Sequence, residues 1–512
     1  MRVPEMDADV IVVGAGPTGL MLAGELRLAG VRPLVLERQP RLPDVPKANG
    51  LGGQVLRLLD HRGLLDRFEA AAAGPSHPAP RYPFGDVHVD FSGLAEPPLR
   101  GLTLPQPELE RLLDERARDF GADVRRGQEV VGFTEDDAGV GADVRGPDGP
   151  YRVTARYLVG CDGGYSRIRE LAGIPFPGTT YPEVNRLGQV TLADSVTRSA
   201  DGDLDVPGLG PVRTGFTRTA TGLFGFGPLD EQVVLVLTTE DGPVEADDAP
   251  LTEAEFQDSV RRVLGGTLPL GRVVRLSRYR MQARQAERYR AGRVLLAGDA
   301  AHLFPSTGVG LNAGLLDAAN LAWKLAADLA GWAPPGLLDT YDAERRHAGA
   351  RTMLHTQAQV ALRRGRDDAA VALREVFQEL LTDEQPLLRL GALIAGTDLR
   401  YPPPDPGAHV LTGTFAPDVA LRAVGGADAA RPVLLDLADR PDLREVAGPW
   451  RHRVDVRTAE LPDRPADALL IRPDAHVAWA ATTGEPAATA EPALRAALSR
   501  WFGAPASPAD AP

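Results

Sequence analysis

Residues 14–19, Gly-Ala-Gly-Pro-Thr-Gly, constrain the fold of this chain more than any other stretch. They match the pattern G-x-G-x-x-G and lie between an apolar run, Val10–Val13, and an expected helix over residues 20–29. Gly14 allows a tight turn, Gly16 lets the backbone approach a pyrophosphate, and Gly19 lets the helix pack closely on the strand. The chain therefore begins with a unit typical of dinucleotide binding.

Glu37 strengthens this interpretation. It ends a second expected strand, 33–37, and follows Gly14 by 23 residues. A carboxylate at this place accepts hydrogen bonds from the ribose hydroxyls of an adenosine. The helix N-terminus at 20–29 presents unpaired N–H groups to the phosphates. Strand, helix and acid together favour a dinucleotide site over an ordinary glycine-rich turn.

Two further strands of the same style end in an acid. Asp162 and Gly163 follow an expected strand at 156–159, and Asp299 follows Val294–Ala297. A carboxylate at the end of a strand, beside a helix N-terminus, suits a ribose or ribityl hydroxyl near a phosphate.

Composition excludes several classes of protein. One cysteine among 512 residues rules out an internal disulfide and a zinc cluster of several thiolates, and it suits a reducing compartment. A net charge of −14 argues against nucleic-acid binding. The acidic N-terminus is unlike a signal peptide, and there is no uninterrupted apolar run of about 18 residues. We therefore expect a cytoplasmic protein with no membrane segment.

Pattern changes divide the chain. Residues 176–284 are rich in β-type stretches, whereas the segments before and after them alternate strands and helices. Helices are expected at 108–120, 312–329 and through much of 340–395, followed by a proline-rich linker at 401–407. The expected domains are a dinucleotide-binding domain in two parts, 1–175 and 285–400, with a β-rich substrate domain inserted at 176–284. A small α/β domain is expected at 405–512, with strands at 433–437 and 468–472 and a helix at 491–502.

In this order and spacing the motifs resemble those of the class A flavoprotein monooxygenases, which share the fold of p-hydroxybenzoate hydroxylase and phenol hydroxylase. The most specific stretch is 298–324, which contains Gly298-Asp299 and Gly308-Val-Gly310-Leu-Asn312. The phrases at 19–26 and 60–64 and the extra C-terminal domain are especially similar to aromatic polyketide hydroxylases and their rifampicin-hydroxylating relatives.

The resemblance implies an α/β fold with a Rossmann-like FAD-binding domain of the glutathione reductase type (GR2), an inserted β-sheet substrate domain and a thioredoxin-like C-terminal domain without Cys-x-x-Cys. It implies non-covalent FAD, with NADPH or NADH as co-substrate. The residues that would bind these cofactors are Gly14, Gly16, Pro17, Thr18, Gly19, Glu37, Arg38, Lys47, Gln106, Asp162, Gly163, Asp299, Pro305, Gly308, Gly310, Leu311 and Asn312. In the family, Pro305 and residues 308–312 lie against the isoalloxazine ring.

Two positions depart from the family pattern. Gln54 stands where an arginine usually contacts the pyrophosphate, so we expect Lys47 or Arg38 to supply the charge. Val309 stands where glutamine is frequent between the two glycines.

The substrate site is less defined. Phe216, Phe224, Phe226 and Tyr279 are candidates to line an aromatic pocket, although each residue type is also common in a core. No catalytic side chain is identified, and only the loop of Pro305, Gly308 and Gly310 is expected to adjoin the reacting ring. His302 fits either a structural or a catalytic role.

The leading hypothesis is hydroxylation of a polycyclic aromatic polyketide through a flavin C4a-hydroperoxide formed from O₂. The alternatives are Baeyer–Villiger oxygen insertion into a polyketide ketone and a non-catalytic flavin-binding assembly protein. The C-terminal domain is expected to have a packing or assembly role beyond a hinge at 402–406, and the sequence leaves a homodimer open.

Overall fold

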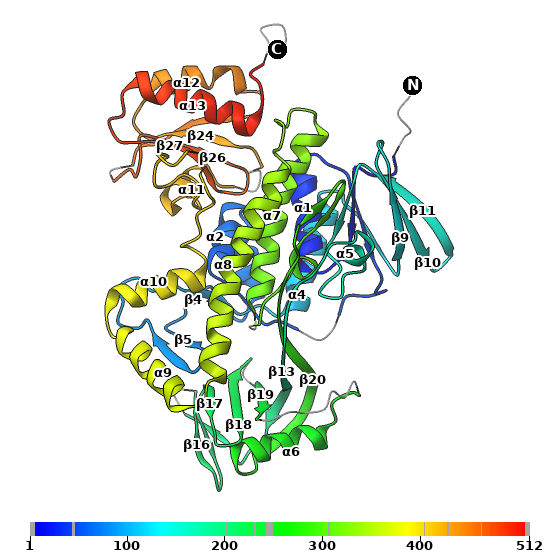
Figure 1. Cartoon of the computed structure of the whole chain (residues 1–512), viewed down its shortest axis with the longest axis vertical. Coiled ribbons are helices and arrows are strands. Elements are labelled where there is room, and N and C mark those ends of the chain that lie inside the picture. The colour runs from blue at the N-terminus through cyan, green and yellow to red at the C-terminus, as the bar shows by residue number, and fades with distance from the viewer. Residues whose placement is uncertain are drawn as a thin grey trace.

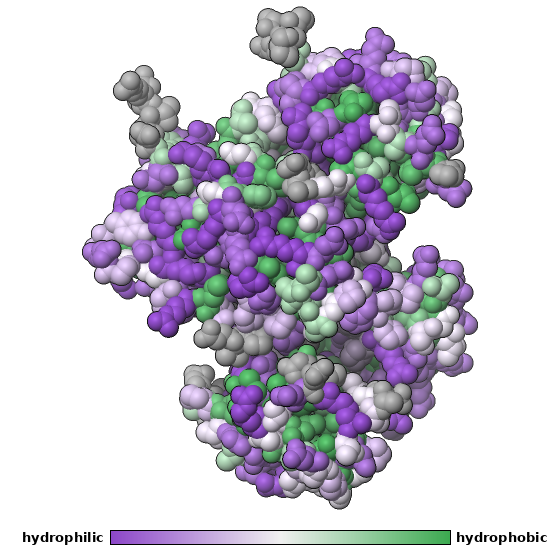
Figure 2. Space-filling view, turned by 180° about the vertical axis from the view of Figure 1, so that it is seen from behind, coloured by the Kyte–Doolittle hydropathy of each residue, from purple (hydrophilic) through white to green (hydrophobic). Residues whose placement is uncertain are grey.

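Three lobes make up the molecule in the computed structural model, which describes residues 6–43, 47–199, 202–229, 232–241, 249–305, 308–403, 405–426, 430–461 and 463–506. A lobe around a parallel sheet lies in the middle, an antiparallel sheet lies at one end, and the C-terminal residues form a small lobe at the other (Figure 1). Seen from behind, hydrophilic residues cover most of the surface, with hydrophobic ones in small patches (Figure 2).

The central sheet has the strand order β21-β22-β12-β1-β2-β8. Its strands are β1 (Val10–Val13), β2 (Pro33–Glu37), β8 (Asp123–Arg126), β12 (Tyr157–Gly160), β21 (Arg290–Ala291) and β22 (Val294–Leu296). All neighbours are parallel except β21 and β22. Together with α1 (Pro17–Leu28), β1 and β2 confirm the predicted strand–helix–strand unit.

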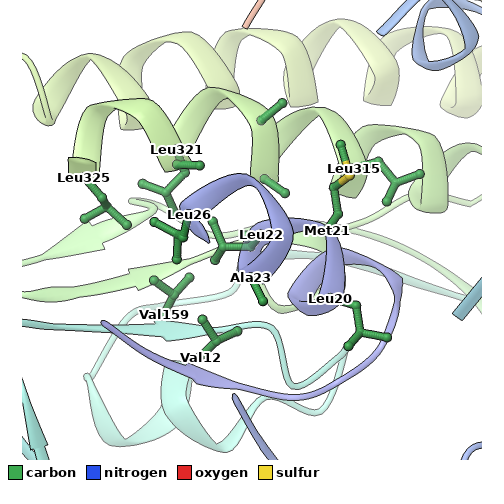
Figure 3. Packing of buried hydrophobic residues seen from close by; sticks show 14 of the residues in the cluster. Val12, Leu20, Met21, Leu22, Ala23, Leu26, Val159, Leu315, Leu321 and Leu325 are labelled. Atoms are coloured by element: carbon green, nitrogen blue, oxygen red, sulfur yellow. The ribbon is translucent and has the colours of Figure 1, made fainter. Parts of the chain in front are cut away.

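Helix α1 is buried on two sides, which explains its nearly continuous apolar sequence. Figure 3 shows its side chains between the sheet and α7 (Val309–Leu329). Leu20, Met21, Leu22 and Leu26 are fully buried and belong to one cluster with Val12, Val159, Leu315 and Leu321. Because α7 begins at the expected flavin-facing loop, this packing fixes that loop relative to the glycine turn.

The second large sheet is antiparallel and has the order β17-β18-β19-β13-β20-β23. Its strands are β13 (Gly178–Leu192), β17 (Gly215–Arg218), β18 (Gly222–Pro228), β19 (Val233–Glu240), β20 (Leu270–Gln285) and β23 (His302–Leu303). Arg284 of β20 pairs with Leu303 of β23, two residues before Pro305. This sheet therefore reaches the expected flavin-facing loop.

One face of that sheet carries a helix that the sequence analysis did not predict, α6 (Glu253–Leu264). Thr252 caps it, since its hydroxyl oxygen accepts a hydrogen bond from the Glu255 N–H at 3.2 Å. The other face adjoins the C-terminal part of α8 (Asp339–Arg364), which runs down from the central lobe (Figure 1).

Shorter elements complete these two lobes. The helices are α2 (Gln54–His61), α3 (Leu65–Ala71), α4 (Gln106–Asp119), α5 (Arg167–Leu171), α9 (Asp368–Leu380) and α10 (Glu384–Ala395). The strands are β3 (Leu51–Gly52), β4 (His77–Pro78), β5 (Arg81–Phe84), β6 (Val87–Asp90), β7 (Arg100–Leu102), β9 (Glu129–Glu135), β10 (Val140–Gly146), β11 (Gly149–Ala155), β14 (Thr197–Arg198), β15 (Leu204–Val206) and β16 (Gly210–Val212). None of the helices in the described ranges is long and apolar enough to cross a bilayer.

The C-terminal lobe is a four-stranded sheet in the order β25-β24-β26-β27. Its elements are α11 (Asp418–Val424), β24 (Val433–Asp436), α12 (Pro441–Val446), β25 (Asp455–Thr458), β26 (Ala468–Ile471), β27 (Val477–Ala481) and α13 (Ala487–Phe502). β24 is parallel to β25 and antiparallel to β26, and β26 and β27 form an antiparallel hairpin.

The hinge expected at 402–406 stays a prediction: its described residues are exposed or half-buried, whereas the chain on both sides of it is packed. Tyr401, directly before it, is 2% exposed, and its N–H donates to the Gly413 carbonyl at 2.9 Å. Apolar residues of the C-terminal lobe, including Phe415 and Leu421, share a core cluster with α1 and α2. Proline content could not reveal that both sides of the segment are packed, because that packing depends on residues far apart in the sequence.

Candidate functional site

The glycine turn is closed toward the protein and open on its outer side. Gly14 has φ +104°, and a Cβ there would lie 2.4 Å from the carbonyl oxygen of Cys161. A Cβ on Gly19 would lie 2.0 Å from the carbonyl oxygen of Gly14. A Cβ on Gly16 would meet none of the described atoms within 4 Å. The backbone at Gly16 is therefore accessible to a ligand at the N-terminus of α1.

Glu37 is held beside this turn by two backbone donors. Its Oε2 accepts a hydrogen bond from the Ala15 N–H at 2.8 Å, and its Oε1 accepts one from the Gln39 N–H at 2.7 Å. Arg38, the next residue, is exposed and lines a shallow depression with Glu129 and Arg145. The Glu37 carboxylate is fixed at the glycine turn, whereas Arg38 lies exposed at the shallow depression.

The Asp162 carboxylate accepts hydrogen bonds from its own loop and the helix that follows it. Its Oδ1 accepts from the Ser166 hydroxyl at 2.6 Å, and its Oδ2 accepts from the Ile168 N–H at 3.1 Å. Gly163 follows with φ +85° and open space where a Cβ would lie. Arg169 links this loop to the next acid, since it donates to the carbonyls of Gly164 at 3.0 Å and Ala300 at 2.9 Å.

Asp299 differs from the other two acids because its side chain makes no hydrogen bond to any residue within the described ranges. It is accessible to solvent yet surrounded by protein, and this desolvation raises the pKa of its carboxyl group, opposed by the charges of His302 and Lys47. Gly298 brings the loop against α1, since a Cβ there would lie 2.6 Å from the hydroxyl of Thr18. Asp299 is therefore free to accept hydrogen bonds from a ligand near the glycine turn.

A buried network of hydrogen bonds around Asp317, which was not predicted from the sequence, holds the Asp299 loop in place. Asp317 accepts from the Gly298 N–H at 3.0 Å and from Nε of Arg345 at 2.6 Å, and it lies 2.8 Å from Nε2 of His302. Burial opposes ionisation, but Arg345 and His302 outweigh it and hold the pKa of Asp317 below its usual value. His302 is thus a structural histidine. The only signal in the sequence was an acid within the apolar helix 312–329.

The N-terminus of α7 lies against Asp299. A Cβ on Gly310 would lie 3.2 Å from Oδ1 of Asp299. The Asn312 amide donates to the Gly308 carbonyl at 3.3 Å and accepts from the Gly52 N–H at 3.3 Å. Pro305 is buried and Leu311 half-buried. Residues 306 and 307 lie outside the described ranges.

Lys47 and Gln106 lie close to each other, since the Gln106 N–H donates to the carbonyl of Ala48 at 2.9 Å. Gln106 donates to Glu110 at 2.6 Å, and the exposed Lys47 exerts its charge on the carboxyl groups of both Glu110 and Asp299. Gln54 is buried, and its amide nitrogen has no partner among the described residues. Of the two basic residues expected to supply charge to the cofactor, Lys47 acts on Asp299, whereas Arg38 lines a separate depression. The contact of either residue with the cofactor stays a prediction.

The aromatic candidates fall on two faces of the antiparallel sheet. Phe224 and Phe226 are buried in a cluster with Phe256 of α6, so they belong to the core and not to a pocket. This corrects the expectation for these two residues, which the alternation along β18 could not assign to a face. A narrow cavity of about 30 Å³ lies on the opposite face, at the C-terminal end of α8. Tyr279 and Phe216 both interact with Arg363, which lines it.

Comparison with known proteins identifies this arrangement. A family model described as "FAD binding domain" matches residues 7–356, and one described as "Aromatic-ring hydroxylase, C-terminal" matches residues 409–505. The chain belongs to this family of FAD-binding hydroxylases. It is an FAD-dependent monooxygenase, and its geometry fits FAD, because the backbone at Gly16 is open and Asp299 has an unused carboxylate.

Several full-length relatives are known. The chain is 41% identical to 12-dehydrotetracycline 5-monooxygenase/anhydrotetracycline 6-monooxygenase of Streptomyces rimosus, over 98% of this chain and all of that protein. It is 40% identical to rifampicin monooxygenase of Streptomyces venezuelae, over 97% and 99%. A dialkyldecalin synthase of Streptomyces rugosporus is 38% identical over 97% and 99%. The solved structure of OxyS anhydrotetracycline hydroxylase from Streptomyces rimosus superposes with a TM-score of 0.84 at 39% identity, covering 98% of this chain and 100% of that one.

Proposed function

We propose that this monooxygenase hydroxylates a polycyclic aromatic polyketide, with NADPH or NADH as the source of electrons and O₂ as the source of oxygen. The observation that carries this proposal is the full-length identity to enzymes named for tetracycline and rifampicin substrates.

We assign the cofactor contacts by position. The glycine turn with Pro17 and Thr18 would hold the pyrophosphate, Glu37 the adenosine ribose, and Asp299 the ribityl hydroxyls. Lys47 would neutralise phosphate charge, and Gln106 would contact the cofactor from α4. Asp162 and Gly163 would act indirectly, by holding their loop against the Asp299 turn.

When bound, FAD accepts electrons from NAD(P)H and activates O₂. The chain's contribution is orientation and charge. Pro305, Gly308, Gly310, Leu311 and Asn312 would lie against the ring, where the free N–H groups that begin α7 stabilise negative charge. No nucleophilic side chain is needed for this chemistry.

We also propose a domain division that follows the sheets, with 1–175 and 285–400 as the FAD-binding domain, 176–284 as the substrate domain and 405–512 as a thioredoxin-like domain. The parallel β24–β25 pair, joined to an antiparallel hairpin and covered by α12 and α13, supports the last assignment. A homodimer and a cytoplasmic location stay predictions.

The test is incubation of the FAD-loaded protein with NADPH, isotopically labelled O₂ and a panel of tetracyclic and angular polyketides, followed by mass spectrometry. Hydroxylation predicts one labelled oxygen in a product that resists mild hydrolysis. A product that hydrolyses to a ring-opened acid would favour Baeyer–Villiger insertion instead. Reading the label directly matters because one relative is named as a synthase. No labelled product with any member of the panel would refute the proposal.

A further inference from the structure

Buried polar side chains connect the C-terminal lobe with the loop that carries Asp299, and Arg345 of α8 is the centre of this connection. Its Nε donates to Asp317 at 2.6 Å, and its Nη1 donates to the Tyr401 hydroxyl at 2.8 Å. Its Nη2 donates to the carbonyl of Ala313, near the start of α7, at 3.2 Å. Arg345, Asp317 and Tyr401 are all buried, so these hydrogen bonds are shielded from water and hold their geometry.

Tyr401 is attached to the C-terminal lobe through its backbone and its ring. Its N–H donates to the Gly413 carbonyl at 2.9 Å, and the Gly413 N–H donates to the carbonyl of Val477 in β27 at 2.8 Å. The Tyr401 ring stacks on the ring of His476, with the ring centres 4.4 Å apart and the planes inclined by 24°. The position of the Tyr401 hydroxyl therefore depends on how the C-terminal lobe is docked.

Asp317 carries the connection to the turn before Asp299. Its Oδ2 accepts a hydrogen bond from the Gly298 N–H at 3.0 Å. Gly298 has φ +63° and lies tightly against Thr18, so the turn has one well-defined position. The Asp299 carboxylate, one residue further on, makes no hydrogen bond to any described residue. Its direction is therefore set by the turn that Asp317 holds.

This connection reaches only one half of the proposed FAD site. Glu37, which we assign to the adenosine ribose, is held by the N–H groups of Ala15 and Gln39. Across the described ranges, no hydrogen bond joins the side chains of Asp317, Arg345 or Tyr401 to the glycine turn or to Glu37. A change at Tyr401 is therefore expected to affect Asp299 and to leave Glu37 in place.

We propose that Tyr401 is a positioning residue for FAD, through which the docked C-terminal lobe strengthens binding of the flavin half of the cofactor. Arg345 and Asp317 pass its position on to Asp299, and the ADP half is bound independently of them. This inference rests on the proposed contact between Asp299 and the ribityl hydroxyls. It gives a function in the cofactor site to a lobe that contains no cysteine. Because coupling between two sites is reciprocal, bound FAD must in turn strengthen the docking of the lobe.

The test measures the two halves of the cofactor separately. Dilution of the FAD-loaded full chain gives the dissociation constant of FAD from the fluorescence of the released flavin, and competition with ADP gives that of ADP. Tyr401→Phe keeps the ring on His476 and removes only the hydroxyl. We expect FAD to bind at least about fivefold more weakly to this variant, the lower end of ordinary coupling between sites, and ADP to bind as it does to the parent protein.

Further variants assign the effect to the lobe. His476→Ala removes the ring on which Tyr401 stacks and should also weaken FAD more than ADP, whereas His476→Phe keeps an aromatic contact and should restore most of the FAD affinity. The matched control is Tyr157→Phe. It also removes the hydroxyl of a buried tyrosine, but this hydroxyl donates to Asp328 at 2.5 Å and not to the connection through Arg345. It should lower stability without changing the ratio of the two dissociation constants.

Hydrogen exchange tests the reciprocal effect. Addition of FAD to the flavin-free full chain should slow amide exchange in residues 409–414, which contact Tyr401 from the C-terminal lobe, and addition of ADP should not. Tyr401→Phe should reduce this protection by FAD.

Unchanged FAD affinity in Tyr401→Phe would overturn the inference, and so would equal weakening of FAD and ADP, which a purely structural role predicts. If Tyr401→Phe does not fold, hydrogen exchange of the parent protein decides, since protection of residues 409–414 that is the same with ADP as with FAD contradicts the coupling. Failure of the underlying cofactor assignment appears separately, as an Asp299→Ala variant that binds FAD as tightly as the parent protein. If Asp299→Ala weakens FAD and Tyr401→Phe does not, the inference alone fails.

Discussion

Replacing Arg472 by methionine should lower the stability of the protein, because it removes the contact that joins the C-terminal lobe to α8. Arg472 follows β26 and is 2% exposed. It donates to both oxygens of Glu344 on α8, at 2.5 and 2.8 Å, and to Oδ1 of Asp474 at 2.9 Å. Its guanidinium also lies over the ring of Trp501, 4.6 Å from the centre. One side chain thus joins α8 to the C-terminal sheet.

The size of the expected loss in the free energy of unfolding depends on which partners Glu344 and Asp474 keep. Removing one member of a buried ion pair costs about 3–5 kcal/mol, because the partner charge is left without compensation. Lys324 still contacts Glu344 at 2.7 Å, and Asn320 still donates to Asp474 at 2.8 Å. We therefore expect a decrease of about 3 kcal/mol in the free energy of unfolding. Methionine fills much of the same volume, so little of this loss comes from a cavity.

Urea unfolding of the FAD-loaded protein, followed by tryptophan fluorescence, measures this loss. The control is Arg431→Met, which removes an exposed pair with Asp455 in the same lobe and should cost less than about 1 kcal/mol. A difference of less than about 1 kcal/mol between the two variants would refute the reasoning. A further check is Arg472→Met combined with Glu344→Gln, which should recover part of the stability by removing the uncompensated charge.

Four other outcomes are expected. Acid precipitation should release all FAD into the supernatant, and yellow colour retained on the polypeptide would contradict non-covalent binding. Asp299→Ala should retain less FAD after gel filtration than Cys161→Ala, by about 1–3 kcal/mol of binding free energy, because ribityl hydroxyls would lose their acceptor; equal FAD content would count against the assignment. Burial lowers the pKa of His61 and His355 to about 4, so the unfolded chain takes up protons before the folded protein does as the pH falls. The free energy of unfolding, measured by urea unfolding, should therefore decrease as the pH drops from 6.5 to 4. A free energy of unfolding that stays constant over that range would disprove this prediction. A chain truncated after Pro403 should be less soluble yet able to bind FAD if it folds, whereas a soluble truncation that holds FAD and has lost NADPH-driven reduction would assign the C-terminal lobe to the redox step.

The cofactor half of the protein was predictable because its signals are local. A glycine that needs φ +104°, a strand of four apolar residues and an acid at the end of the next strand are all visible within residues 10–37. The same holds for Asp299, since it lies three residues after the buried strand β22. These features depend on backbone geometry that few residue types tolerate.

The substrate half was harder because its signals are non-local. Alternation along β18 indicates two faces but not which one meets α6, so Phe224 and Phe226 were placed wrongly. Arg364, for example, pairs with Glu183, about 180 residues away in the sequence, so its environment is not visible in any local pattern. By contrast, α6 could have been found, since Thr252 and Glu255 have the spacing of a capping box.

The central parallel sheet also dictates when the cofactor can bind during synthesis. β22 and α7 are indispensable to the site, yet residues 161–293 are made between β12 and β22. At typical translation speeds, a nascent chain waits on the order of ten seconds with the edge of β12 exposed. The antiparallel sheet can meanwhile fold on its own strands. We therefore expect FAD loading to be a late event, after β22 and α7 have been made.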